Sequence, residues 1–282
     1  MTARRYRIVN VFALAGQPLS GNPLCVFEDG TGLDDATLQA LALQLNLSET
    51  TFVLPSERAA ARVRIFTPSF EMPFAGHPTL GTAHVVRALR GAGDALQLEM
   101  RAGIIPVTGQ GDRWTLRANP PRRRAVAASR AQLAQMLGLD ERDLGAEPAW
   151  IDTGIEQLLV PLAAAAALDR CRPDVALLER HGCLAPGRCL VYVWAEAAPG
   201  EIHARFFFSK GTAVIEDPAT GSACANLGGW FTLVQPQRLP LTARVLQGRH
   251  VRRPSELGLR VDGAGIHVSG LVIEVASGTF AV

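Results

Sequence analysis

The pattern E-x-P-x-x-G occurs twice in this chain, at matching places in its two halves. The first copy spans residues 71–76 and the second spans residues 216–221, a constant offset of 145 residues in a chain of 282. Each copy follows an apolar, β-like run that carries Arg-x-Phe, with Arg64 in the first half and Arg205 in the second. Small residues and a helix-like stretch follow each copy. A duplicated strand, turn and helix predicts an α/β protein of two similar halves.

Two helices that begin at such turns have a chemical consequence. The N-terminus of a helix presents unpaired backbone N–H groups and the positive end of the helix dipole, and it therefore binds anions. If the two N-termini meet across a central cleft, they hold one anionic ligand together. The sequence predicts an enzyme with its site between the halves.

A chain of 282 residues can form one large domain or two small ones, and the repeat favours two. The chain is 48% hydrophobic, which suffices for a substantial core, and 27 Gly and 18 Pro indicate many tight turns. The segment Asn119–Arg124 (NPPRRR) is the best linker candidate, because prolines deny it ladder hydrogen bonds and arginines keep it in water. We therefore expect an N-terminal half over residues 1–121 and a C-terminal half over residues 122–269.

Charge and cysteine content exclude several classes of protein. A net charge of +2 gives no general electrostatic case for binding nucleic acid or a membrane. Lys210 is the only lysine, so a pyridoxal-phosphate enzyme has a single Schiff-base candidate. Five cysteines, an odd number without a C-x-x-C pair, predict a reduced intracellular protein. No signal peptide or membrane-length apolar run is apparent, and a soluble cytoplasmic protein is expected.

Periodicity predicts the elements that surround the motifs. In the first half, Asp34 or Asp35 caps a helix through Leu45, and a second helix runs from Pro78 to Leu89 and ends at Gly91. In the second half, the stretch from Gly221 to Phe231 is the matching helix. Strands are expected at residues 6–12, 23–27, 50–54, 62–66, 96–100, 104–108, 114–117, 155–160, 190–194, 202–208 and within 259–282.

Glu49 is the leading candidate for acid–base chemistry. It lies in NLSETTFVL, where a helix ends and an apolar strand begins, so two elements hold its backbone. Partial burial at such a junction suits a general acid or base. The alternative is an ordinary surface glutamate at a helix end, which composition alone favours.

His77 stands between Gly76 and Pro78 in the first motif. Pro78 disfavours helical geometry at His77, which places the histidine just ahead of the helix. Its side chain then faces whatever the helix N-terminus binds. A structural, hydrogen-bonded histidine is an equal alternative. His84 lies seven residues further on, but two histidines without a third ligand make a poor metal site.

The second motif, DPATGSA, offers its own polar groups. Asp217 precedes Pro218, and Gly221 allows a ligand to approach the backbone closely. Thr220 or Ser222 can serve merely as a helix cap, the ordinary use of such residues. Taken together the string is too specific for a plain helix start, so Asp217, Gly221 and Ser222 are candidate ligand-binding residues. Phosphate-binding glycine loops, a G-x-S-x-G turn and zinc spacing are all missing from the sequence.

These strings resemble the PhzF-like phenazine-biosynthesis family, which has the diaminopimelate epimerase-like fold. The resembling blocks are VNVFA, GNPLCVF, NLSETTFVLP, FTPSFEMPFAGHPTLGTA, IDTGIEQLLVPL, HARFF, EDPATGSA and LQGRHVRRPSEL. Together they run from about residue 9 to the C-terminus. One departure is Arg253, at a place where the family often has glycine.

The resemblance implies a fold and a set of roles. The fold has two α+β halves, each a curled mixed sheet around a central helix, and the last strand, about residues 270–282, joins the first half. Glu49 takes the place of the family's proton-shuttling glutamate. His77, Asp217 and Ser222 fall on substrate-contacting positions, with backbone N–H groups near Gly76 and Gly221. A homodimer, a small carboxylated substrate and neither metal nor organic cofactor are also implied.

The implied reaction is an isomerisation. Related epimerases and racemases use two cysteines, but this chain has Ala75 and Thr220 at those places, which excludes two-thiol racemisation. We expect Glu49 to relocate a proton between carbons on one face of a conjugated acid, as in isomerisation of trans-2,3-dihydro-3-hydroxyanthranilate. The alternatives are an isomerase or epimerase of another amino or hydroxy acid, and a small-molecule binder without turnover.

Overall fold

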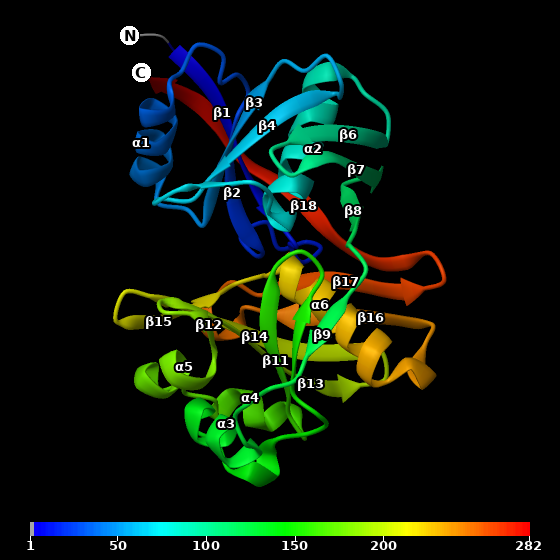
Figure 1. Cartoon of the computed structure of the whole chain (residues 1–282). Coiled ribbons are helices and arrows are strands. Elements are labelled where there is room, and N and C mark those ends of the chain that lie inside the picture. The colour runs from blue at the N-terminus through cyan, green and yellow to red at the C-terminus, as the bar shows by residue number, and fades with distance from the viewer. Residues whose placement is uncertain (1–2) are drawn as a thin grey trace. The chain divides into compact units, whose positions relative to one another are not determined.

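Strands wrap one long helix in each of two units, as the ribbon in Figure 1 shows for the computed structural model, which describes residues 3–282. The first unit contains the chain up to Arg117 together with Ser269–Val282, and the second contains Ala118–Val268. The predicted α+β fold class is confirmed, because helices and strands of mixed direction occur in both units.

The first unit contains two helices and most of the N-terminal strands. Its helices are α1 (Asp35–Leu45) and α2 (Gly76–Arg90). Its strands are β1 (Ala3–Val11), β2 (Asn22–Phe27), β3 (Glu49–Leu54), β4 (Ala61–Phe66), β5 (Glu71–Met72), β6 (Ala95–Met100), β7 (Gly103–Gln110), β8 (Arg113–Arg117) and the greater part of β18 (Gly265–Ala281).

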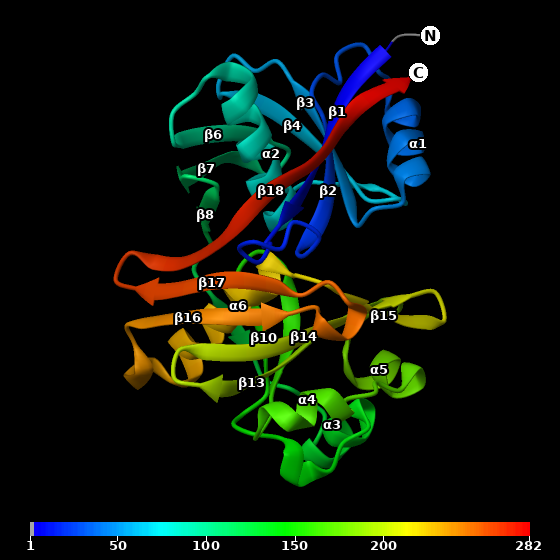
Figure 2. The same ribbon diagram turned by 180° about the vertical axis from the view of Figure 1, so that it is seen from behind.

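The sheet of the first unit closes around α2. β18 pairs antiparallel with β1 and also pairs with β8, so the strand order β18-β1-β2-β3-β4-β6-β7-β8 returns to β18. Both ribbon views show β1 and β18 side by side (Figures 1 and 2). Gly81 lets α2 approach the strands: a Cβ atom there would lie 2.6 Å from Leu24 Cδ2 and 2.8 Å from Val11 Cγ2. The helix is therefore the core of this unit.

Helix α1 covers the outer face of the same sheet. Its start is set by Asp34, whose side chain accepts a hydrogen bond from the backbone N–H of Thr37, and its end by Asn46 in the left-handed conformation. Both boundaries agree with the sequence prediction. The buried residues of α1 pack on a cluster that contains the stacked rings of Phe27 and Phe52, whose centroids are 4.9 Å apart.

The second unit has one long central helix and three shorter ones. Its helices are α3 (Arg130–Leu137), α4 (Ala165–Arg170), α5 (Val175–His181) and α6 (Gly221–Val234), with 3-10 turns η1 (Glu141–Asp143), η2 (Pro236–Arg238) and η3 (Arg249–Val251). Its strands are β9 (Arg122–Arg124), β10 (Ala149–Asp152), β11 (Glu156–Pro161), β12 (Cys183–Ala185), β13 (Arg188–Ala198), β14 (Glu201–Lys210), β15 (Ala213–Asp217), β16 (Leu241–Gln247) and β17 (Ser255–Asp262).

Two helical layers enclose the sheet of the second unit. Strand pairing runs β9-β10-β11-β13-β14-β16-β17, parallel at β11–β13 and at β14–β16 as it is at β2–β3 and β4–β6 in the first unit. α6 packs on one face, with ten of its residues buried. α3, α4 and α5 cover the other face through one hydrophobic cluster. The matching strand directions support the duplication inferred from sequence.

Each unit fixes its E-x-P-x-x-G turn with an arginine–glutamate pair. Arg64 in β4 donates to both carboxylate oxygens of Glu71, at 2.8 and 2.7 Å. Arg205 in β14 donates to Glu216 from Nε at 3.2 Å and from Nη2 at 2.7 Å. Each guanidinium also lies over the phenylalanine two residues further along its own strand, 5.0 and 4.7 Å from the ring centroid. The repeated Arg-x-Phe and the repeated glutamate are thus one structural device.

The predicted linker is only partly correct. Arg122–Arg124 forms β9, which pairs antiparallel with β10. The arginine side chains are exposed as expected, but Arg124 stacks over Trp150 at 4.7 Å and pairs with Glu156 at 3.0 Å. Backbone pairing to a strand that lies far along the chain overrides the local proline and charge signals.

The cysteine prediction also needs correction. Cys183 in β12 and Cys189 in β13 lie opposite one another in the antiparallel register and form a disulfide. The other three cysteines are free and buried. Spacing in the sequence does not reveal this pair, because the hairpin between the two strands creates the contact.

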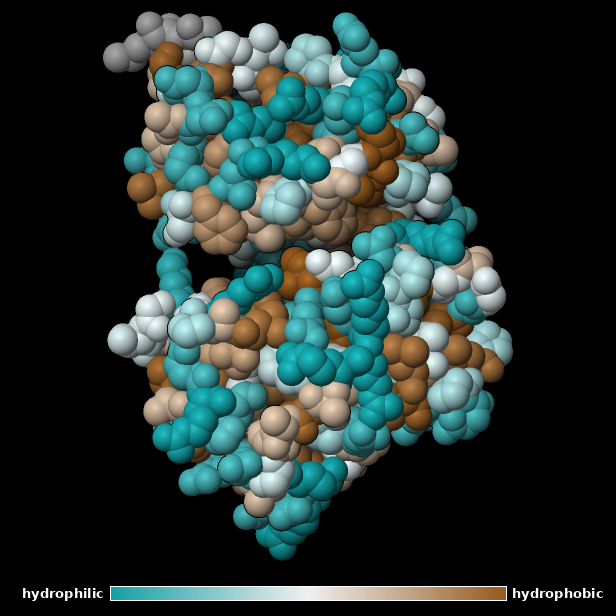
Figure 3. Space-filling view, in the orientation of Figure 1, coloured by the Kyte–Doolittle hydropathy of each residue, from teal (hydrophilic) through white to brown (hydrophobic). Residues whose placement is uncertain are grey.

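Hydrophilic side chains, teal in Figure 3, spread over the visible face of both units with apolar residues among them. Several arginines, such as Arg5 and Arg142, are largely exposed. Within residues 3–282, none of the helices combines the length and the apolar character that crossing a bilayer requires.

We expect Glu216→Gln to lower the free energy of unfolding by about 3–5 kcal/mol, because it leaves the Arg205 guanidinium buried without its counter-charge. Arg205 and Glu216 are only 7% and 8% exposed. Urea unfolding measures the loss. Glu196→Gln breaks the exposed ion pair with Arg238 in the same unit and is the control, with an expected cost below about 1 kcal/mol. Equal losses in the two variants would contradict a special role for the buried pair.

The stabilising effect of Glu71 is expected to depend on pH. The hydrogen bond from Arg64 lowers the pKa of Glu71 in the folded chain, whereas the unfolded carboxyl has a pKa of about 4.3. Its contribution is therefore complete above that value and is lost as pH falls through the folded pKa. Unfolding curves should show the largest difference between wild type and Glu71→Gln near neutral pH and a shrinking difference below about pH 4.3. A difference that stays constant down to strongly acidic pH would rule this out.

Candidate functional site

Glu49 is the first residue of β3, directly after the connection from α1. Its backbone lies beside Leu24 in the parallel pairing of β3 with β2. Two residues further along β3, the hydroxyls of Thr51 and Thr82 are 2.8 Å apart, which ties this strand to α2. The start of β3 therefore has a fixed position relative to the central helix.

His77 is the second residue of α2, so the prediction that it stands just ahead of the helix is wrong: Pro78 lies in the first turn, where its missing N–H has no partner to lose. The histidine is only 5% exposed. Its Nδ1 lies 3.1 Å from Oε2 of Glu49, so the fold brings together two residues that are 28 positions apart in sequence. The contact is close in distance but lacks hydrogen-bond alignment, since Oε2 of Glu49 has no hydrogen-bond partner among residues 3–282. Nε2 of His77 is likewise buried and unpartnered within that part of the chain. Both atoms therefore have hydrogen-bonding capacity that the described residues leave unused.

The second unit has no carboxylate at the position that matches Glu49. In both units the phenylalanine of the Arg-x-Phe pattern pairs with the residue that follows this position, Thr50 in β3 and Val191 in β13. The preceding residue is Glu49 in the first unit and Leu190 in the second. The duplication thus retains one acid–base side chain at this position, not two.

Neither central helix is capped by a side chain. The N-cap residues are Ala75 for α2 and Thr220 for α6, and neither makes a side-chain hydrogen bond to the first turn. The interpretation of Thr220 as an ordinary cap is therefore wrong. The first-turn backbone of each helix, at Gly76 and at Gly221, retains its capacity to bind an anion.

Thr220 instead bonds to the aspartate of its own motif. Its hydroxyl donates a short hydrogen bond to Oδ2 of Asp217. Gln247, at the end of β16, donates from Nε2 to Thr220 Oγ1 at 3.0 Å and to the backbone oxygen of Asp217 at 2.9 Å. Because Thr220 accepts from Gln247, its proton is directed at the carboxylate. Gln247 and Thr220 therefore hold the Asp217 segment in one conformation.

Gly248, which follows Gln247, also packs against the second motif. Its φ of +81° lies in the left-handed region, and a Cβ atom there would lie 2.4 Å from the oxygen of Pro218 and 2.2 Å from the oxygen of Arg253. The turn after β16 thus packs directly on the second motif. Burial in this region also lowers the pKa of Arg253.

Ser222 is held from the sheet beneath α6. Its Oγ accepts a hydrogen bond from Nε2 of Gln157 at 2.9 Å, and Gln157 is bonded in turn to Asn226. The sequence reading did not select Gln157, Asn226 or Gln247. Each of these residues is a polar side chain within a largely apolar stretch of sequence. That pattern alone does not show which groups the side chains contact.

Other polar clusters lie apart from these residues. His84 is not beside His77; its Nδ1 is 3.8 Å from Asp112, and burial lowers its pKa. Within residues 3–282, Glu179 with Cys183 and Cys189 is the group with metal-ligand spacing, but its two sulfurs are bonded to each other. Burial raises the pKa of the Cys224 thiol in α6.

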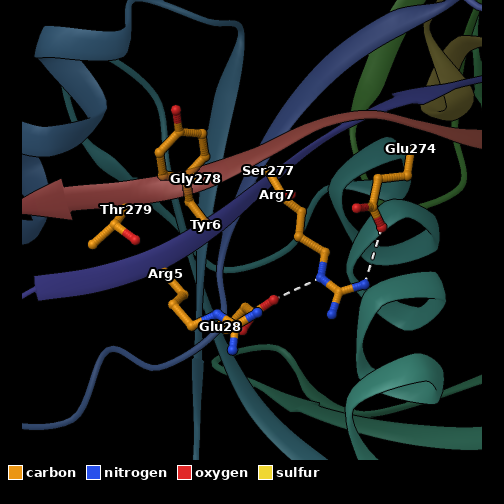
Figure 4. A pocket seen from close by; sticks show the side chains of 8 residues that line it. All are labelled: Arg5, Tyr6, Arg7, Glu28, Glu274, Ser277, Gly278 and Thr279. Atoms are coloured by element: carbon orange, nitrogen blue, oxygen red, sulfur yellow. Dashed lines mark hydrogen bonds and ion pairs between the residues drawn. The ribbon is translucent and has the colours of Figure 1, made fainter.

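A polar hollow of about 380 Å³ on the first unit, shown in Figure 4, contains none of the predicted residues. Its charged groups satisfy one another. Arg7 donates to Glu28 at 2.6 Å and to Glu274 at 3.0 Å, and these bonds raise the pKa of Arg7. Arg5 pairs with the other oxygen of Glu28 at 3.4 Å. These charged groups therefore join β1 to β18 and to the residue that follows β2.

A family model, two curated relatives and a solved structure are all similar to this chain over most of its length. The family model described as PhzC-PhzF, phenazine biosynthesis-like protein, matches residues 9–277. The trans-2,3-dihydro-3-hydroxyanthranilate isomerase of Pseudomonas aeruginosa is 36% identical over 284 residues, covering 98% of each protein. An uncharacterized isomerase of Pasteurella multocida is 38% identical over 282 residues, covering 99% of this chain and 94% of that protein. The crystal structure of a PhzF-family phenazine biosynthesis protein of Bacillus anthracis matches with a TM-score of 0.88 at 26% identity, covering both chains completely.

We expect Gly248→Ala to destabilise the second unit by more than the roughly 1–2 kcal/mol that a left-handed alanine costs by itself, because its Cβ also collides with two backbone oxygens. Gly187→Ala is the matched control, since Gly187 has a φ of +72° and open space around its Cβ position. Thermal unfolding of both variants checks this. Equal shifts in the two variants would show that the contact with Pro218 is not tight.

Proposed function

Because this chain belongs to the family of phenazine biosynthesis-like proteins and is an isomerase of the PhzF type, we propose that it moves a carbon-bound proton on a small, conjugated carboxylic acid with one glutamate. The observation that carries the proposal is the contact of Glu49 with the buried His77 at 3.1 Å, at the start of the central helix. The leucine at the matching position of the second unit favours a single-base reaction over a two-base one.

Glu49 is proposed to act first as a base and then as an acid. The carboxylate removes a proton from one carbon and leaves a delocalised anion. The resulting carboxylic acid returns the proton to another carbon on the same face, so the substrate is isomerised and Glu49 is restored. Such general acid–base catalysis contributes roughly 10²- to 10⁴-fold in rate. Positioning of the substrate and electrostatic stabilisation of the anion must supply the remainder.

The remaining candidate residues are proposed to hold the substrate. The uncapped first turns at Gly76 and Gly221 suit a carboxylate, because backbone N–H groups and the helix dipole both favour an anion. His77 offers the unpartnered Nε2, and Asp217 offers a carboxylate kept in place by Thr220. Ser222 contributes its hydroxyl. We propose no metal or organic cofactor in these steps.

The proposed substrate is trans-2,3-dihydro-3-hydroxyanthranilate, the compound named for the isomerase of Pseudomonas aeruginosa. A different amino or hydroxy acid is the second candidate, because the relative with 38% identity is an isomerase with no named substrate. Incubation in D₂O with each candidate acid distinguishes them through the new C–D bond in the true substrate. Binding without any exchange would instead identify a non-catalytic binding protein.

A homodimer and a cytoplasmic location complete the proposal. Light scattering on the purified protein tests the first, and fractionation of the host cell tests the second. A monomer at micromolar concentration would remove the dimer from the proposal without affecting the chemistry.

We expect Glu49→Gln to lower kcat by roughly 10²- to 10⁴-fold, because the amide keeps the shape of the side chain but cannot accept the proton. The variant should still bind the substrate and unfold at the same temperature as wild type. Glu99→Gln is the matched control, since Glu99 is a partly buried glutamate of the same unit whose carboxylate accepts a hydrogen bond from Ser56. Turnover of the true substrate by Glu49→Gln at the wild-type rate would refute the assignment.

A further inference from the structure

The two central helices can be matched residue by residue. The motif copies that begin them are 145 residues apart, so Asn226 in α6 stands where Gly81 stands in α2, and Ser222 stands where His77 stands. The two helices therefore place different residues at equivalent points above their sheets.

The strands beneath the helices can be matched in the same way. Counted from the Arg-x-Phe strand through the paired residues, Gln157 in β11 matches Leu24 in β2. Thr153, just after β10, then matches Val11 at the end of β1. The first unit is apolar at these points: Gly81 rests directly on Leu24 and Val11.

The second unit has a polar network at the same points. Asn226 Oδ1 accepts from the backbone N and the hydroxyl of Thr153, at 2.9 and 2.7 Å. Asn226 Nδ2 donates to the backbone oxygen of Ile155 at 2.9 Å and to Oε1 of Gln157 at 2.8 Å. Gln157 Nε2 then donates to Oγ of Ser222 at 2.9 Å. Asn226 and Gln157 are 0% and 2% exposed.

The direction of every hydrogen bond in this network is fixed by the backbone. The N–H of Thr153 can only donate and the carbonyl of Ile155 can only accept, which sets the orientation of the Asn226 amide. Asn226 then requires the oxygen of Gln157 on its side, so the NH₂ group of Gln157 faces Ser222. Since Ser222 Oγ accepts this bond, its own proton is free to be donated to another group.

A stability argument alone does not account for the network. A buried polar network adds little net stability compared with well-packed apolar residues, and it becomes costly if any member loses its partner. The first unit fills the same space with Gly81, Leu24 and Val11. The polar version in the second unit additionally ties Ser222 to β11 through Gln157.

We propose that Gln157 is a positioning residue that occupies one acceptor site of the Ser222 hydroxyl and leaves its proton to the substrate, which favours a substrate acceptor such as a carboxylate or hydroxyl oxygen over an ammonium group. The inference rests on the proposed function, because it takes Ser222 to contact the substrate. It adds the polarity of that contact and the residues that determine it.

Kinetics of a double-mutant cycle test the proposal. Gln157→Leu reproduces the residue of the first unit and is expected to raise KM by about tenfold or more, with kcat changed less than about threefold, because Glu49 is untouched. In a Ser222→Ala background the same substitution should have no further effect on KM.

Thr232→Val, which removes a hydroxyl of α6 bonded to Gly228, is the control and should leave KM unchanged. An equal effect of Gln157→Leu in both backgrounds would overturn the proposal. If Gln157→Leu does not fold, Gln157→Met, of similar length and without a donor, replaces it.

A second readout separates this inference from the proposed function. In ¹⁵N-labelled protein the side-chain NH₂ signals of Gln157 and Asn226 should be protected from solvent exchange, and Ser222→Ala should shift those of Gln157. If wild type turns over none of the candidate acids but these signals behave as expected, the proposed function fails and the network stands. Unprotected signals, or signals that Ser222→Ala leaves unchanged, refute the network whatever the activity.

Discussion

The arginine–glutamate pair beneath each central helix is the constraint on which the rest of the structure depends. It joins the strand that carries Arg-x-Phe to the turn that starts the helix, and in the second unit both partners are more than nine-tenths buried. A buried charge that loses its counter-charge is strongly destabilising, so the turn cannot move independently of the sheet. Every candidate residue at a helix start therefore has a fixed backbone position.

The two units share this arrangement of strand, turn and central helix, but they place different side chains on it. In the first unit apolar packing around Gly81 leaves His77 beside Glu49. In the second unit Asn226 and Gln157 hold Ser222, while Leu190 occupies the place of the glutamate. One copy thus carries the proposed acid–base group and the other carries the proposed substrate-holding groups, a division that a duplicated fold makes possible because each copy keeps its own core.

Local patterns predicted many of the elements because their signals are short-range. Asp34 begins α1 and Gly91 ends α2 through contacts within a few residues. Arg122–Arg124 was missed as a strand, since its paired residues in β10 lie 26 to 30 positions further along the chain. Gln157 was missed for the same reason: it sits in an apolar strand, and its meaning depends on Asn226, 69 residues away.

The sequence by itself determined the duplication, the α+β class, the family and the candidate residues, because each of these depends on which residues occur and how they are spaced along the chain. Tertiary structure decided what the residues contact. It brings Glu49 within 3.1 Å of His77. It also shows that the Thr220 hydroxyl bonds to Asp217 and does not cap α6, and that Gln157 donates to the Ser222 hydroxyl. These are contacts across strands and between helix and sheet, and hydrogen-bond direction is fixed only once the chain has folded around both partners.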